Sequence, residues 1–230
     1  MRSEAIAAGC LLASFMGGLA EAQVARPRPK AARIEVTVER SESGTWKSVE
    51  PTLVFSSGDL VRFRFKSNFS GYLYVTNYGT SGAAEKLFPR HDTGTANRVL
   101  STQAYTVPTT NTAFRIAGPP GYDSVYWLVS PVKLDGGPMG ALPAPPDVKP
   151  PVLIPRCDTV TLRARGLCLD PEAGPKPVTD RDTVPDALTP LKGMAARQLT
   201  VIQNQNNQSV LSAEEGPAMP LLYEFRLAHN

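Results

Sequence analysis

The sequence predicts an all-β protein, an immunoglobulin-like antiparallel sandwich with a Pro-rich irregular insertion. The first observation is a series of short runs between residues 33 and 130 in which apolar and polar residues alternate. The second is the Gly, Pro and Asn residues that separate these runs about every 8–12 residues, a spacing typical of sandwiches and barrels. The third is an apolar content of 42% in 230 residues, which suffices for a core and excludes general disorder.

The predicted strands follow the chain in order. Ile34–Glu39 places β-branched residues at its apolar positions. Leu60–Lys66 follows a Ser-Gly-Asp turn and is the clearest half-buried strand, and Tyr72–Tyr78 pairs with it as a hairpin. We assign residues 33–130 to the sandwich core. Shorter strands are predicted at Lys86–Pro89, Arg98–Leu100, Ala104–Val107, Ala113–Ile116 and Val125–Val129.

The second half of the chain is less regular. Residues 131–196 hold most of the 22 prolines, which predicts a linker or insertion that loops out of the sandwich. One or two helical turns are predicted at Thr189–Arg197. Leu199–Ile202 and Leu221–Leu227 are predicted strands, and the last one alternates well. We therefore expect residues 197–230 to return to the sandwich.

The N-terminus has the three parts of a secretory signal peptide over residues 1–22. Arg2 precedes an apolar run at Ala5–Met16, and Ala20-Glu21-Ala22 offers small residues for cleavage before Gln23. The alternative is a lipoprotein box ending at Cys10, but most of the apolar run lies after that cysteine. The prediction is an exported protein, periplasmic or secreted, whose basic leader at residues 23–32 is flexible. No stretch reaches the roughly 18 apolar residues of a membrane span.

Two cysteines remain after cleavage, Cys157 and Cys168. An even pair in an exported protein predicts a disulfide, here one that closes a small β-hairpin loop. The alternatives are a metal site and a redox pair. A metal site needs further ligands, and neither histidine is near in the sequence; the C-x-x-C spacing of redox dithiols is also absent. The sequence predicts no metal and no cofactor.

Short motifs recur along the predicted sandwich in a fixed order: a GDLVRF turn and strand, a GYLYV strand, an LFP strand end and a PPG turn. In this order they resemble a bacterial family of domains of unknown function, over about residues 35–131. The resemblance implies an accessory β-sandwich module of exported or envelope proteins, also appended to protein kinases and caspase-like peptidases, with no catalytic residue to carry over. The motif residues are Gly58, Asp59, Gly71, Tyr72, Leu73, Tyr74, Leu87, Phe88 and Pro89.

The motif residues also have structural explanations. Gly58 suits a turn position with positive φ, and Asp59 can bond its neighbouring backbone. Gly71 would let the hairpin reverse, and Pro89 would end a strand because it lacks an N–H donor.

The sequence does not favour an enzyme. His229 is the penultimate residue and is expected to fray, which leaves His91 for a hydrolase triad. Asp92-Thr93-Gly94 matches the triplet of aspartic proteases, but a single copy in a polar loop predicts a solvated turn. No catalytic residue is predicted.

Binding has more support. Arg62, Arg64 and Lys66 form a cationic stripe on one strand face that suits a protein or an acidic glycan, although such a stripe is more often a solvated face. The aromatic residues could stack on sugars or anchor a partner, although most are expected in the core. A net charge of +3 argues against nucleic acid. We therefore predict a non-catalytic module that contacts a protein partner in the bacterial envelope, with carbohydrate binding as the alternative and an uncharacterised hydrolase third.

Overall fold

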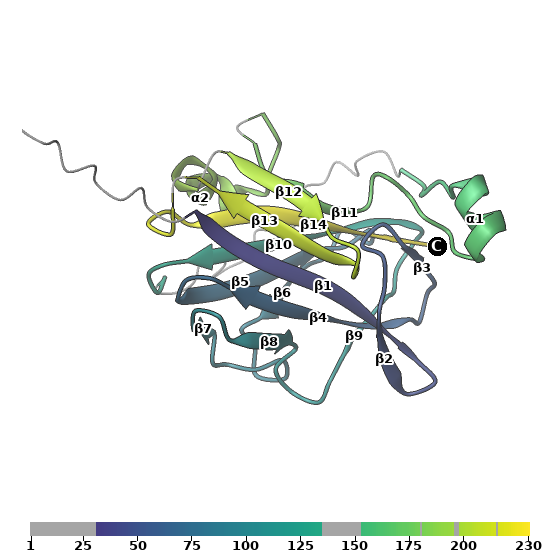
Figure 1. Ribbon diagram of the computed structural model, residues 1–230, viewed down its shortest axis with the longest axis horizontal. Coiled ribbons are helices and arrows are strands. Elements are labelled where there is room, and N and C mark those ends of the chain that lie inside the picture. Colours follow the sequence, from purple (N-terminus) through teal and green to yellow (C-terminus); the bar gives the residue numbers. More distant parts are fainter. Residues whose placement is uncertain (1–30, 135–152, 180, 196–197, 215) are drawn as a thin grey trace, which may run out of the picture.

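The computed structural model describes residues 31–134, 153–179, 181–195, 198–214 and 216–230. The predicted signal peptide and nearly all of the predicted leader lie outside these residues. Two sheets pack face to face as a sandwich, which confirms the predicted all-β class (Figure 1). Over the ranges that the structure describes, no helix is long and apolar enough to cross a membrane.

Sheet 1 has β1 (Ala32–Glu42) and β4 (Leu60–Ser67) at its centre. β13 (Gln208–Ala213) continues it on one side and β12 (Leu199–Gln203) forms that edge. The other members are β2 (Thr45–Ser48), β8 (Ala104–Val107) and β9 (Phe114–Arg115). All its described pairs are antiparallel.

Sheet 2 has β10 (Gly121–Ser130) at its centre, between β5 (Gly71–Tyr78) and β14 (Leu221–His229). The C-terminal strand therefore lies inside the sandwich rather than at its edge. Among the described strands, only β3 runs parallel to its neighbour, β14. The remaining members are β3 (Val54–Phe55), β6 (Ala84–Phe88), β7 (Arg98–Val99) and β11 (Gly174–Pro177).

Aromatic side chains fill the space between the sheets. Trp127 is fully buried, with its ring centroid 5.0 Å from Phe63 in an edge-on contact and 6.0 Å from Tyr223 in a stacked one. Phe65 stacks against the same indole at 6.0 Å. Edge-on and offset contacts of this kind add stability beyond area burial. Trp127 thus joins sheet 2 to sheet 1 at the centre of the core.

The prediction that the Pro-rich segment loops out of the sandwich is wrong for residues 174–179 and 181–195. η1 (Asp186–Leu188) and α2 (Thr189–Met194) pack on the outer face of sheet 2, where Leu188 and Leu191 meet Tyr74, Tyr126 and Leu128. We call residues 178–179 and 181–195 the cover. The apolar outer residues of sheet 2 need shielding from water, and the cover supplies it. β11 also adds to the sheet edge, the place where strands tolerate proline.

The disulfide between Cys157 and Cys168 is present, but the residues it encloses form a helix and not the predicted hairpin. The helix is α1 (Thr159–Arg165). Asp158 caps its N-terminus by accepting from the Val160 backbone N–H, and Gly166 ends it at φ 67°. An Asp N-cap and a Gly just past the last turn favour a short helix over a hairpin.

Candidate functional site

A groove of about 810 Å³ opens at one end of the sandwich, between three loops. The β1–β2 hairpin contributes Arg40, Glu42 and Lys47, and the disulfide loop contributes Arg165. The turn between β12 and β13 contributes an amide-rich wall. We call this the three-loop groove. Val49, Leu53 and Leu167 supply the apolar part of its lining.

The charges of the three-loop groove are already paired with one another. Glu42 accepts from Arg40 at 2.6 Å and from Lys47 at 2.7 Å, and these two contacts lower the pKa of the Glu42 carboxyl to about 2. Arg165 Nη1 lies 2.9 Å from Glu50 Oε1. Such ion pairs near the surface contribute about 0–1 kcal/mol each to folding stability. Charged groups of a partner can therefore replace them with little loss of stability.

The amide wall is held in place by its own side chains. Asn204 Oδ1 accepts from the backbone N–H groups of Asn206 and Gln208, and Asn207 adopts a positive φ of 57°. Ser48 Oγ donates to the Asn206 carbonyl at 3.3 Å, which ties the turn to β2. The asparagines of residues 204–208 indicate a tight turn in the sequence, but the position of this turn beside β2 depends on the order of strands in the sheet.

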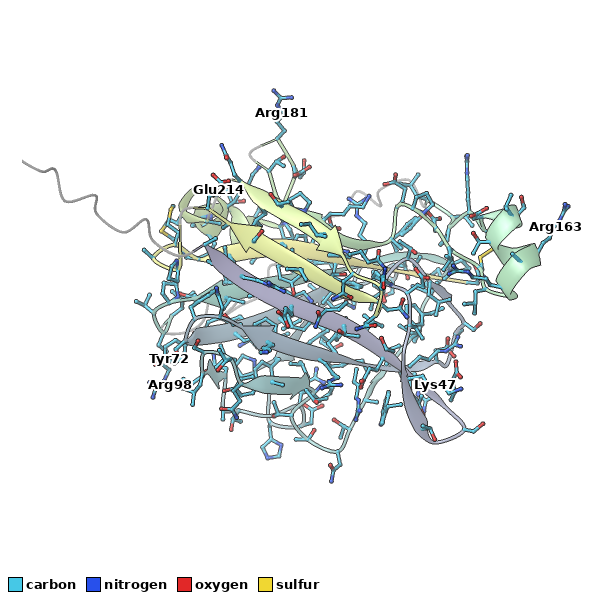
Figure 2. All side chains as sticks on the ribbon, in the orientation of Figure 1. Lys47, Tyr72, Arg98, Arg163, Arg181 and Glu214 are labelled. Carbon is cyan, nitrogen blue, oxygen red and sulfur yellow. A yellow bond between two sulfur atoms is a disulfide. The ribbon has the colours of Figure 1, made fainter. Side chains whose placement is uncertain are left out.

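The disulfide loop projects beyond the end of the sandwich (Figure 1). We call Cys157–Cys168 the α1 projection. None of the helical residues is buried, and Val160 is 74% exposed. Arg163 points away from the molecule (Figure 2). Besides the disulfide, the Asp158 N–H donates to the Leu169 carbonyl at 2.9 Å, so both ends of the helix are fixed.

The predicted cationic stripe lies on the outer face of sheet 1, where the carboxylates of β1 partly neutralise it. Arg62 Nε donates to Glu39 Oε2 at 2.6 Å, and its guanidinium lies 4.4 Å from the centre of the Trp46 ring. Arg64 lies 3.8 Å from the same carboxylate. Lys66 stands opposite Glu35 in the strand register. The stripe is thus separate from the three-loop groove.

The turn and hairpin motifs serve the scaffold. Gly58 has φ 92°, and Asp59 Oδ2 accepts from the Ser56 N–H at 2.9 Å. The predicted hairpin between Leu60–Lys66 and Tyr72–Tyr78 is wrong, because β4 lies in sheet 1 and β5 in sheet 2. Gly71 therefore does not reverse a hairpin; it begins β5, and a Cβ there would come within 2.5 Å of the Ser130 carbonyl oxygen. Close backbone approach explains this glycine better than hairpin reversal.

The side chains of the GYLYV and LFP motifs lie on both faces of sheet 2. Leu73 lies in the core between the sheets, with Leu87 and Phe88. Tyr72 and Tyr74 are on the opposite face, and the Tyr74 hydroxyl accepts from the Leu134 N–H at 2.9 Å. β6 ends at Phe88, directly before Pro89.

The two histidines have different surroundings. His91 is exposed in its loop, and the neighbouring Asp92 pairs with Arg90, which lowers the pKa of the Asp92 carboxyl. His229 is fully buried, which overturns its expected fraying, and its Nε2 lies 3.4 Å from Asp123 Oδ1. β14 ends between β10 and β3, and this position explains the burial. Within the described residues, no group of three or more His, Cys, Asp or Glu could hold a metal ion.

Residues 54–133 match the family model of a bacterial domain of unknown function (DUF4384). The match confirms the resemblance that the sequence motifs predict. β1, β2 and the strands from β11 onward lie outside the matched residues, although they complete both sheets. The cover and the α1 projection also lie outside the match. Neither the curated proteins nor the solved structures gave a match to this chain.

Proposed function

We propose that this protein is an exported, non-catalytic module that binds a protein partner in the bacterial envelope. The contact surface is the three-loop groove together with the α1 projection. The observation that carries the proposal is a short helix with no buried residue, fixed by a disulfide beside a polar groove.

The α1 projection supplies the apolar and arginine contacts that protein interfaces favour. Val160 and Leu162 are exposed, and Arg163 and Arg165 follow them in the last turn. Interface centres are more apolar than their polar rim, and arginine is enriched in interfaces. Because the disulfide already orders the helix, less conformational entropy is lost on binding.

The three-loop groove supplies the polar surround. Its paired charges and fixed amide turn offer donors and acceptors without a strong field of one sign. The acidic and basic residues of a partner segment can form ion pairs with these groove residues and so replace the internal pairs one at a time. This arrangement suits a protein segment better than a highly charged polymer.

Export is supported by the signal-peptide pattern of residues 1–22 and by the disulfide, since disulfides persist in oxidising compartments. The binding role is supported by the separate surroundings of His91 and His229, which leave no histidine beside a serine or cysteine nucleophile of the groove.

Site-specific photo-crosslinking in the native bacterium tests the proposal. A photoreactive residue at Lys47 or at Arg163 is expected to give a defined protein adduct. The same residue at Arg98, which lies at the other end of the sandwich, is expected to give none (Figure 2). Equal labelling from all three positions, or none from Lys47 and Arg163, contradicts the proposal.

A charge-reversal pair adds a second readout. Arg163→Glu is expected to abolish the adduct formed from Lys47, because it inverts the charge of the projection. Arg181→Glu is the matched control, since Arg181 is also exposed but lies in the cover (Figure 2). Loss of the adduct in both variants would point to a general charge effect.

Carbohydrate binding is the second candidate, and the amide wall of the groove favours it. Amide side chains such as Gln203 and Gln205 can bond sugar hydroxyls. The groove lining contains no aromatic ring for stacking, however, which favours the protein partner. Retention of the protein on purified cell-wall glycan, lost in Gln205→Ala, would reverse this order.

A further inference from the structure

A second hollow of about 230 Å³ opens between the two sheets, where β4 begins and β5 ends. We call it the inter-sheet pocket. Its apolar walls include Phe63 and Phe114 from sheet 1 and Leu87 and Val125 from sheet 2. It shares no lining residue with the three-loop groove. Sites for drug-sized ligands measure roughly 300–1,000 Å³, so this pocket suits a smaller molecule.

The side of the pocket that sheet 2 provides carries hydrogen-bond acceptors. Asp123 is 7% exposed, and its Oδ1 accepts from the Thr80 N–H at 2.9 Å and lies 3.4 Å from His229 Nε2. Asn77 Oδ1 is buried and has no hydrogen-bond partner. Buried polar atoms usually have a partner, so this oxygen is free to accept a hydrogen bond from a ligand in the pocket.

The side of the pocket that sheet 1 provides carries a cation without a carboxylate. Arg115 on β9 is exposed, and its Nη1 donates only to the Gly58 carbonyl, at 3.4 Å. No described carboxylate lies within ion-pair distance of it. Arg90, the other arginine of the lining, is paired with both Glu85 and Asp92. The pocket therefore presents a buried anion from one sheet and an unpaired cation from the other.

We propose that the inter-sheet pocket binds a free amino acid with an apolar side chain. The ligand's α-ammonium donates to Asp123 and to Asn77 Oδ1, and its α-carboxylate accepts from Arg115. The side chain lies against Phe114 and Leu87. A single molecule with both charges fits this arrangement, whereas an internal peptide segment has neither. The site is independent of the protein partner proposed above.

Calorimetric titration of the full chain with L-leucine tests this site. Leucine is expected to bind. N-acetyl-leucine lacks the ammonium and leucinamide lacks the carboxylate, so the affinity of each is expected to be lower than that of leucine by a factor of about ten or more. These ligand changes test Asp123 without altering a buried residue.

Two variants separate the site from general charge effects. Arg115→Gln is expected to weaken leucine binding about tenfold and to leave the residual binding of leucinamide unchanged. Arg98→Gln, an exposed arginine on β7, is the control and should bind leucine like the parent protein. The proposal is overturned by an absence of heat with millimolar leucine, by equal binding of N-acetyl-leucine, or by full affinity in Arg115→Gln.

Discussion

The outer faces of the two sheets differ in what covers them. On sheet 1 the outer face is polar, and Glu39 pairs there with Arg62 and Arg64. On sheet 2 the outer face carries Tyr126 and Leu128, which lie buried under the cover. One sheet thus has a single buried face, and the other is buried on both.

The burial patterns of the strands reflect this difference between the two sheets. In β4 the more buried and the more exposed residues alternate, as a half-solvated strand requires. In β10 every residue from Val125 to Ser130 is buried. The comparison shows that Tyr74, Tyr126 and Tyr223 of sheet 2 are buried packing residues. Under the proposed function, the contact surface is therefore the loops at the end of the sandwich rather than an aromatic platform.

The largest expected effect comes from removing an apolar contact of the cover. Leu188 is fully buried against the outer face of sheet 2. Leu188→Ala is expected to lower the free energy of unfolding by about 2–5 kcal/mol, as for a core leucine. Urea denaturation measures it. Ile202→Ala on exposed β12 is the control, with an expected change within about 0.5 kcal/mol. Equal, small effects would mean that the cover is not part of the folded core.

An intermediate effect is expected at Asp170, which ties the α1 projection to sheet 2. Its Oδ2 accepts from the Tyr122 hydroxyl at 2.6 Å and from the Arg156 N–H. Burial alone would raise the pKa of Asp170, but the bonds from Tyr122 and from the backbone N–H groups of Glu172 and Arg156 lower it below its ordinary value. The ionised form therefore stabilises the fold.

Because the folded pKa of Asp170 lies below the unfolded value of about 3.9, this stabilisation is complete above that pH and is lost as the pH falls through the folded value. Asp170→Asn is expected to lower the free energy of unfolding by about 1.5–3 kcal/mol at neutral pH. The free energy of unfolding of this variant should also decrease less between about pH 5 and pH 2 than that of the parent chain. Denaturation at a series of pH values measures both, and parallel pH profiles would argue against this role.

The smallest effect is expected on the open face of sheet 1. Glu39→Gln keeps the shape of the side chain but leaves Arg62 without its counterion, at an expected cost of about 1–2 kcal/mol. Glu35→Gln is the matched control, because the ion pair of Glu35 is with the half-exposed Arg33, and about 0–1 kcal/mol is expected. Thermal denaturation compares the two. If Glu39→Gln lowered the free energy of unfolding as much as Leu188→Ala does, the proposed difference between the two outer faces would be contradicted.

The sequence predicted most of the strands, but it predicted few of the contacts between them and neighbouring segments. Strands such as β4 and β5 were found because alternation and turn residues are local signals. β13 was missed, since Gln208–Ala213 alternates small polar and apolar residues next to a polar turn. The three-loop groove was missed as well, because its walls come from three segments far apart in the chain.

By itself the sequence determined the strand periodicity, the cysteine pair and the family motifs, all of which depend on neighbouring residues. Only the tertiary structure decided that part of the Pro-rich segment covers sheet 2, that His229 is buried beside Asp123, and that Arg115 and Asp123 line one pocket from opposite sheets. These contacts join residues distant in the chain, and burial depends on what packs against a strand, which its own sequence does not specify.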